Sequence, residues 1–136
     1  MAKIKKVDYT FAAGKRKSAI ARVRLFKGKG ESLINDKPLG KYFGGVHSDI
    51  LYLKPLTLTQ NVGKYHISAR VIGGGTNSQL EAFVHATAKA LSKSDVEKYR
   101  SVLKKSGLLT RDSRIRERRK IGMGGKSRRK KQSPKR

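Results

Sequence analysis

A large excess of positive charge is the feature of this chain that most restricts how it can fold. The 136 residues include 34 Lys and Arg against 9 Asp and Glu, a formal net charge of +25 at pH 7. Self-repulsion of that size opposes a compact state unless a polyanion neutralises it. Nucleic acid is the favoured polyanion, because each phosphate that is bound releases condensed counterions. An anionic membrane surface is the alternative, but the sequence contains no basic amphipathic helix or lipidation signal.

The positive charge is concentrated toward the C-terminal end of the sequence. Residues 111–136 contain 13 basic and 2 acidic residues and only three large apolar ones. Such a segment cannot build a core and is expected to stay disordered until it meets its partner. We therefore divide the chain into a basic N-terminal arm over 1–8, a globular domain over 9–107 and an extended basic tail over 108–136.

Several functional classes are disfavoured by what the sequence lacks. It has no Cys, which excludes disulfides, thiol catalysis and Cys-based zinc sites. No apolar run approaches the roughly 20 residues of a membrane span. The three histidines, at 47, 66 and 85, lack metal-ligand spacing, and the acidic residues form no catalytic pair. We expect a non-enzymatic protein without metal or cofactor, in the cytosol or inside an organelle.

Periodicity between the two basic ends predicts an α+β domain with a mixed or antiparallel sheet packed against helices. The predicted strands are 9–13, 19–26, 31–34 and 65–72. In the last strand, alternate residues from Tyr65 to Val71 are apolar and share one face. Short helices are expected over 39–43 and 48–53, the second ended by Pro55.

Two longer helices are predicted in the second half of the domain. Ser78 with Glu81, and Ser94 with Glu97, have the spacing of a capping box, which marks a helix start. Gly107 is expected to end the second of these helices. The core face of the first is expected to comprise Leu80, Phe83, Val84, Thr87 and Leu91.

A cluster of cations lies at the first predicted turn between strands. Lys15, Arg16 and Lys17 are adjacent, and Arg22 and Arg24 share one face of the following strand because side chains alternate with a period of two. This pattern would present a flat positive surface to phosphates. A solvated, charged turn is the alternative, and the overall charge favours binding.

A run of three glycines, Gly73, Gly74 and Gly75, precedes the first long helix. Glycines would let a polyanion approach the backbone next to the partially positive helix N-terminus, which makes a phosphate cradle. The run could equally be a tight turn that needs positive φ, and both interpretations stay open. A second glycine-rich segment, at 122–127, is no nucleotide-binding loop, because Lys120 stands where that motif requires glycine.

The motifs, taken in order, resemble the ninth small-subunit ribosomal protein family in bacterial naming, a universal family. The matching segments are Gly14–Lys17 with Ala21–Val23, Ile34–Asn35 with Leu39 and Tyr42–Gly44, Gly73–Gly75 with Gln79, Gly107–Asp112, Glu117–Lys120 with Gly122, and Lys126–Arg129 followed by Lys135–Arg136. The resemblance covers nearly all of the chain after about Tyr9.

This resemblance implies a ribosomal-protein-type domain with a left-handed βαβ crossover, against the usual handedness. It implies binding to small-subunit rRNA in the head of the subunit, beside neighbouring head proteins. With the basic clusters above, the expected rRNA-binding residues are Lys15, Arg16, Lys17, Arg22, Arg24, Gly73, Gly74, Gly75, Gln79, Arg111, Arg114, Arg118, Arg119, Lys120, Lys126, Arg128 and Arg129. It also implies that Lys135 and Arg136 approach the anticodon stem-loop of the peptidyl-site tRNA.

Two other classes of protein remain as alternatives. A basic protein that compacts DNA or chromatin would share this composition, but no helix-turn-helix or dimerisation motif supports it. A phosphotransferase built around the glycine run is disfavoured, because neither paired acids nor a phosphate-gripping lysine is recognisable.

Residues 111–136 have a high density of charge and few apolar side chains, and this leads to the first prediction. In the free protein this segment is expected to be disordered, and to become ordered only on RNA. Amide NMR of the isolated protein should give narrow, poorly dispersed signals for it. Dispersed and protected amides throughout the segment would contradict the prediction.

Overall fold

Three long strands alternate between a buried and an exposed face and form the body of the sheet. They are β1 (Tyr9–Arg16), β2 (Ala19–Lys27) and β5 (Tyr65–Ile72). The computed structural model describes residues 8–124, apart from the side chains of residues 46 and 47. Within β5 the apolar positions from Ile67 to Val71 are buried, as the alternation predicts.

Two short strands complete a mixed sheet with the strand order β1-β2-β5-β3-β4. They are β3 (Leu33–Ile34) and β4 (Lys37–Pro38). β3 runs parallel to β5, and the other neighbouring strands are antiparallel. Asn35 and Asp36 join β3 to β4 with φ of 49° and 65°, the conformation of a two-residue hairpin turn. The turn at this position was predicted, but the two-residue strand β4 was not.

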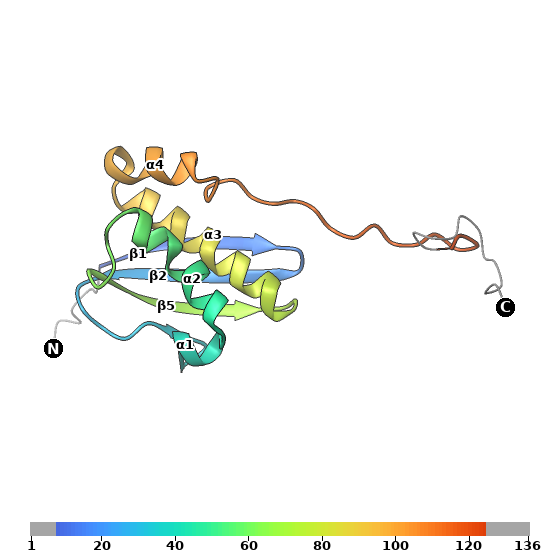
Figure 1. Ribbon diagram of the computed structural model, residues 1–136, viewed down its shortest axis with the longest axis horizontal. Coiled ribbons are helices and arrows are strands. Elements are labelled where there is room, and N and C mark those ends of the chain that lie inside the picture. The colour runs from blue at the N-terminus through green and yellow to red at the C-terminus, as the bar shows by residue number, and fades with distance from the viewer. Residues whose placement is uncertain (1–7, 125–136) are drawn as a thin grey trace, which may run out of the picture.

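Within residues 8–124 four helices lie on one side of the sheet (Figure 1). They are α1 (Leu39–Tyr42), α2 (Val46–Leu58), α3 (Thr76–Ser94) and α4 (Val96–Lys105). α3 packs directly on β1 and β2, while α2 and α4 pack on α3 (Figure 1). The chain passes from β3 through β4, α1 and α2 to β5, which is parallel to β3, and this gives a βαβ crossover. The predicted α+β class is confirmed.

The core depends on a close approach between the backbones of α3 and β1. Gly14 is buried, and a Cβ added to it would lie 2.4 Å from the carbonyl oxygen of Ala82 and 2.6 Å from the amide nitrogen of Ala86. Phe83 and Leu91 of the same helix are fully buried. Each such side chain stabilises the fold by about 1.5–3 kcal/mol on burial. The small residues at the contact bring α3 close enough to the sheet for these larger side chains to be buried.

α2 extends further than predicted, because Pro55 lies inside the helix and does not end it. The Pro55 side chain is fully buried and Leu56 is 5% exposed. Core packing here offsets the loss of one backbone N–H donor that proline causes. Tyr52 and Phe43 are also buried, so these aromatic residues pack in the core.

The boundaries of α3 and α4 differ from both predicted capping boxes. α3 begins at Thr76 after Gly75, so Ser78 lies within its first turn. α4 is capped by Asp95, which accepts a hydrogen bond from the Lys98 amide, and Ser94 belongs to α3. The predicted core face of α3 is confirmed, with Val84 only partly buried and four alanines added.

Gly107 ends α4 as predicted. Its φ is 72°, a conformation that glycine adopts without strain. The amide of Leu108 donates to the carbonyl of Leu103 and that of Gly107 to Lys104, at 3.2 and 3.1 Å. This pair of bonds is the Schellman motif. It turns the chain out of the helix and toward the tail.

Replacing Gly14 by Ala is expected to destabilise the protein by about 1–3 kcal/mol. The added methyl group would collide with the backbone of α3, which cannot move without disturbing the core. Urea denaturation measures the change, with Gly44→Ala as the control, since no atom lies within 4 Å of a Cβ there. Equal stabilities for the two variants would show that α3 can shift away from β1.

Candidate nucleic-acid interface

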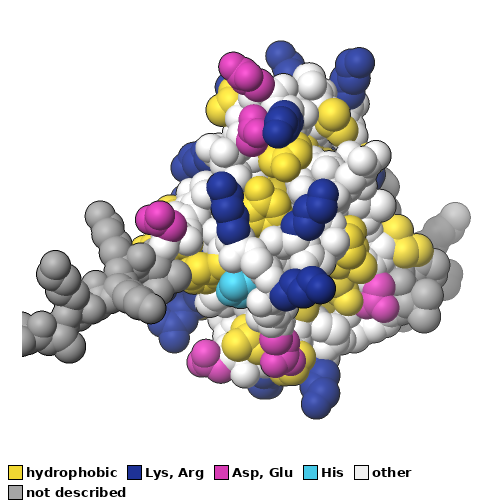
Figure 2. Space-filling view, turned by 90° about the vertical axis from the view of Figure 1, so that its left-hand side faces the viewer, with side chains coloured by type: hydrophobic (Ala, Val, Ile, Leu, Met, Phe, Trp, Pro, Cys, Tyr) yellow, Lys and Arg dark blue, Asp and Glu magenta, His cyan; other side chains and the backbone are white. Residues whose placement is uncertain are grey.

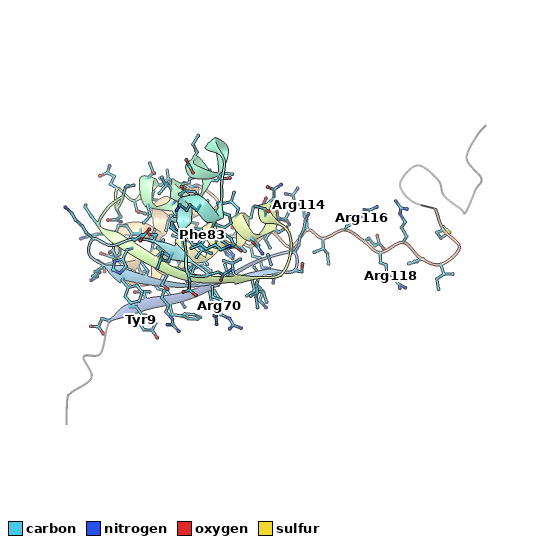
Figure 3. All side chains as sticks on the ribbon, turned by 90° about the horizontal axis from the view of Figure 1, so that it is seen from below. Tyr9, Arg70, Phe83, Arg114, Arg116 and Arg118 are labelled. Atoms are coloured by element: carbon cyan, nitrogen blue, oxygen red, sulfur yellow. The ribbon has the colours of Figure 1, made fainter. Side chains whose placement is uncertain are left out.

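The face of the sheet opposite the helices is open and carries a group of arginines. Arg22, Arg24 and Arg70 are all exposed on this face. In Figure 3 the labelled Tyr9 and Arg70 project from the sheet away from the helices. Arg22 is directly opposite Arg70 in the register of β2 with β5. Within residues 8–124 none of the three arginines forms an ion pair.

Aromatic side chains lie next to these arginines. Phe26 stacks on His66 with ring centroids 5.0 Å apart and an interplanar angle of 9°. Tyr9 lies 5.6 Å from Phe26, and the guanidinium of Arg24 lies 5.3 Å from the centroid of the Tyr9 ring. Phe11 is directly opposite Arg24 and is 46% exposed. The face therefore combines cations with exposed ring surfaces.

Sequence reasoning found Arg22 and Arg24 on this face but missed Arg70 and Phe11. The alternation of β5 already places Arg70 opposite its apolar face. What the sequence does not reveal is that β5 pairs with β2, which brings Arg70 beside Arg22. Phe11 was included in the first predicted strand, but its exposed side could not be assigned without the position of α3.

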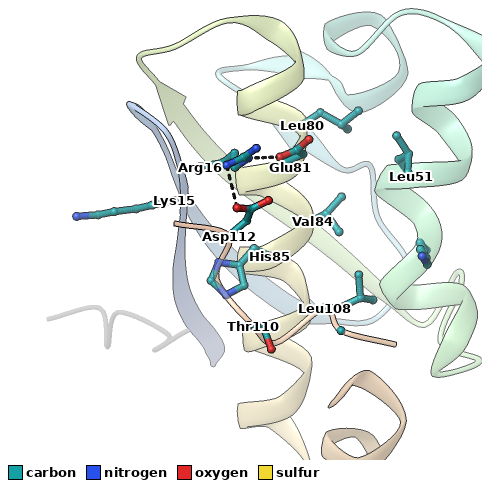
Figure 4. Close-up of a pocket in the computed structure, with 12 residues that line it drawn as sticks. Lys15, Arg16, Leu51, Leu80, Glu81, Val84, His85, Leu108, Thr110 and Asp112 are labelled. Carbon is teal, nitrogen blue, oxygen red and sulfur yellow. Dashed lines mark hydrogen bonds and ion pairs between the residues drawn. The ribbon is translucent and has the colours of Figure 1, made fainter. Parts of the chain in front are cut away.

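The basic turn between β1 and β2 divides its three cations between two environments. Lys15 and Lys17 are exposed, as expected of a phosphate-binding surface. Arg16 differs, because only 11% of its side chain is exposed and it bonds to Glu81 of α3 and to Asp112 (Figure 4). The prediction that Arg16 belongs to a flat exposed surface is wrong, because two acidic residues distant in sequence hold it against the domain.

Arg16 fastens the start of the tail to the domain, so the disorder expected of residues 111–136 in the free protein does not extend to Asp112 and Arg114. Its Nη1 donates to the carbonyl oxygen of Arg114 at 2.7 Å and lies 3.2 Å from Oδ1 of Asp112. Asp112 in turn accepts bonds from the Arg114 side chain and backbone amide. The Arg114 side chain, then its backbone amide, hold the pKa of Asp112 well below its usual range. We call Arg16, Glu81, Asp112 and Arg114 the tail anchor.

The glycine run forms a tight turn against the first hairpin. Gly73 and Gly74 have φ of 77° and 65°, and a Cβ on Gly73 would lie 2.6 Å from the carbonyl oxygen of Ser18. This geometry supports the tight-turn interpretation. Around Gly75 there is open space, and this residue is the N-cap of α3 without a side-chain cap. The phosphate-cradle interpretation stays a prediction for that position.

Gln79 is engaged in the fold and supports the glycine turn. Its Nε2 donates to the carbonyl of Gly73 at 3.0 Å, and its Oε1 accepts a bond from the Tyr42 hydroxyl at 2.8 Å. Asn35 donates to the same Tyr42 oxygen and bonds the backbone of β5 at Val71. This network links the β3–β4 hairpin to the start of α3, so the amide of Gln79 has two internal partners.

A hollow of about 220 Å³ lies between α2, α3 and the tail anchor, lined by both apolar and charged side chains (Figure 4). His85 borders it, with Nε2 3.3 Å from the Leu109 carbonyl oxygen. Its Nδ1 is buried with no hydrogen-bond partner within the described residues. Burial lowers the pKa of His85 below its usual value. A neutral, half-buried histidine fits packing of the tail start against α3.

Beyond the tail anchor the described chain is exposed and forms no helix or strand as far as residue 120, and it then makes a turn closed by a bond from the Met123 amide to the Lys120 carbonyl. Arg111 and the residues from 113 to 120 are exposed, and Figure 3 shows Arg114, Arg116 and Arg118 spaced along this segment. Figure 2 shows that Lys and Arg side chains are also spread over the end of the domain that faces the viewer. The predicted site residues Lys126, Arg128, Arg129, Lys135 and Arg136 lie outside the described residues.

Two further features of the described residues bear on function. No group of three or more His, Asp or Glu side chains within residues 8–124 could hold a metal ion. None of the helices in that part of the chain is long and apolar enough to cross a membrane. An α+β domain with an arginine-bearing open sheet face and a cationic tail is typical of nucleic-acid-binding proteins.

Comparison with known proteins gives the family. A family model described as ribosomal protein S9/S16 matches residues 14–136. Proteins named small ribosomal subunit protein uS9 from Maridesulfovibrio salexigens and Solidesulfovibrio magneticus are 43% and 44% identical over 118 residues, covering 87% of this chain and 90% of each relative. The protein of the same name from Dehalococcoides mccartyi is 42% identical over 120 residues, covering 88% of this chain and 90% of that relative.

The chain belongs to the ribosomal protein S9/S16 family. It is a structural, non-enzymatic constituent of the small ribosomal subunit. The family resemblance that the ordered motifs indicated is thereby confirmed.

Replacing Arg16 by Gln is expected to release the start of the tail. The change removes the donors that join Glu81, Asp112 and the Arg114 carbonyl, and hydrogen exchange of the Arg114 amide should quicken about fivefold. Lys15→Gln removes the same charge from an exposed side chain and should leave exchange unchanged. Equal exchange in both variants would show that other contacts hold the tail.

The protection at Arg114 should be maintained from pH 7 down to about pH 5. The lowered pKa of Asp112 means that the folded state favours its charged form. This contribution is therefore present above the ordinary Asp pKa of about 3.9 and is lost as the pH falls through the lowered value. Loss of protection already at pH 5 would contradict a charged Asp112 in the anchor.

Proposed function

We propose that this protein binds rRNA in the head of the small subunit, and that its C-terminal end contacts the peptidyl-site tRNA. Neighbouring head proteins would lie against the domain. The observation that carries the proposal is the anchored, extended tail of a chain with net charge +25. A cationic segment held at one end supports binding at a distance from the domain.

The length of the tail supports the part of the proposal that concerns tRNA. The sequence continues for 22 residues after Arg114, and a fully extended chain of that length spans about 73–79 Å. That is several times the 10–12 Å diameter of a helix. Lys135 and Arg136 would therefore act well away from the rRNA that the domain contacts.

The cations of the domain support the part that concerns rRNA. Lys15, Lys17, Arg22 and Arg24 are exposed, and they lie on the basic turn and the open sheet face. Phosphate contacts position a protein on RNA without reading its sequence, which suits a structural role. Compaction of DNA has no comparable support, because the family match points to a ribosomal subunit.

Removing Lys135 and Arg136 is expected to weaken the binding of tRNA at the peptidyl site without blocking subunit assembly. One or two charge-assisted hydrogen bonds would be lost, so tRNA affinity should fall by roughly 1–3 kcal/mol. The measurement is the dissociation rate of tRNA from intact and truncated small subunits at matched salt and magnesium.

A control separates the tail end from general loss of charge. Lys104→Gln with Lys105→Gln removes the same two charges at the end of α4, where both residues are exposed. These subunits should release tRNA at the wild-type rate. If the truncated subunits also do so, the tail end makes no contribution at the tRNA site and the protein is an rRNA scaffold alone.

A further inference from the structure

We propose that the open sheet face binds an unpaired RNA nucleotide, with its phosphate between Arg22 and Arg70 and its base against Phe11. The inference rests on the proposed rRNA binding and adds a site and a class of ligand to it. Phe11 and Arg70 were not among the residues expected to bind RNA.

The first observation is that two like charges are opposed on the surface. Arg22 and Arg70 are direct cross-strand partners on the exposed face, and Arg24 is one alternate position further along β2. Like charges directly opposite each other destabilise a sheet. No acidic side chain within residues 8–124 forms an ion pair with any of them. An anion between the guanidinium groups would remove this repulsion.

The second observation is a hollow at the same place. A cavity of about 270 Å³ is lined by the three arginines, with Phe11 and Leu33 providing apolar surface and Asp36 a carboxylate. Its volume lies just below the roughly 300–1,000 Å³ typical of small-molecule pockets. A space of this size suits a single nucleotide.

The mixture of side chains favours RNA over an acidic protein segment. A guanidinium forms two parallel hydrogen bonds to a phosphate and also stacks on planar rings. Exposed aromatic rings stack on the unpaired bases that RNA displays in loops and bulges. The Asp36 carboxylate can accept a hydrogen bond from the amino group of a base, whereas it would repel an acidic peptide.

Duplex RNA fits the site less well. Bases in a helix are stacked on one another, and a protein reaches mainly the phosphates and 2′-hydroxyls of a duplex. Phe11 would then have no role. The presence of Phe11 opposite Arg24, 46% exposed, therefore points to a base that has left its stack.

The test measures binding of the full chain to a fluorescent single-stranded oligocytidylate. Phe11→Leu keeps an apolar side chain but removes the ring, and should weaken binding about tenfold. Phe11→Tyr keeps the ring and should bind as wild type. Melting temperatures of both variants show whether they are folded.

Replacing one arginine of the Arg22–Arg70 pair is expected to increase the stability of the free protein and to weaken its binding to RNA. Arg70→Gln should raise the melting temperature of the free protein by about 2 °C, because the repulsion disappears. It should also reduce the slope of log affinity against log salt concentration for oligocytidylate by about 0.7, because one phosphate contact is lost. Arg100→Gln removes an exposed charge from α4 and is the matched control, with neither change expected.

Binding of the wild type to intact small-subunit rRNA tests the proposed function separately from the nucleotide site. If the wild type binds that rRNA but Phe11→Leu and Arg70→Gln bind oligocytidylate like Arg100→Gln, the nucleotide site is wrong. Equal competition by a polyglutamate peptide would likewise overturn it, because charge alone would then explain the binding.

Discussion

The contact between the backbones of α3 and β1 at Gly14 determines where most of the other groups lie. Because no side chain separates them, the first turns of α3 reach the end of β1, and Glu81 meets Arg16. Arg16 can then hold Asp112 and the start of the tail. The same contact covers the middle of one face of the sheet, whereas the opposite face stays exposed to solvent. Both surfaces that we propose to bind RNA depend on this packing.

The arginines of this protein serve two different purposes. Arg16 is largely buried and has acidic partners, so its charge is balanced inside the chain. The three arginines on the open sheet face have no such partner within residues 8–124. A count of basic residues does not separate these groups. The positions of the nine acidic residues separate the two groups, because Glu81 and Asp112 both form ion pairs with Arg16.

Local patterns in the sequence were sufficient to predict most of the elements. The alternation in β5, the helical spacing in α3 and the glycine that ends α4 are each encoded by neighbouring residues. Pro55 was misjudged because its burial, which depends on distant parts of the chain, outweighs its local effect. The capping boxes failed for two other reasons. The glycine turn, packed against Ser18, starts α3 at Thr76, and Asp95 rather than its neighbour Ser94 caps α4.

The candidate site was less predictable, because its residues are joined by strand pairing and by long-range ion pairs. Arg22 and Arg24 follow from alternation alone, but Arg70 joins them only through the register of β2 with β5. Arg16 and Glu81 are 65 positions apart in the sequence, so no local pattern reveals that they meet. Motif order identified the family correctly because it samples the whole chain at once.

The opposition of Arg22 and Arg70 also has a consequence for the lifetime of the protein. Repulsion between them lowers the stability of the unassembled chain, whereas an anion bound between the paired guanidinium groups would stabilise the folded state, because only that state brings them together. An unassembled copy therefore unfolds more often than an assembled one. Proteases act on the unfolded population, so, if the proposed site binds RNA, surplus copies that find no ribosomal RNA would be removed faster than those in subunits. The surface that would bind RNA thus also shortens the life of chains made in excess.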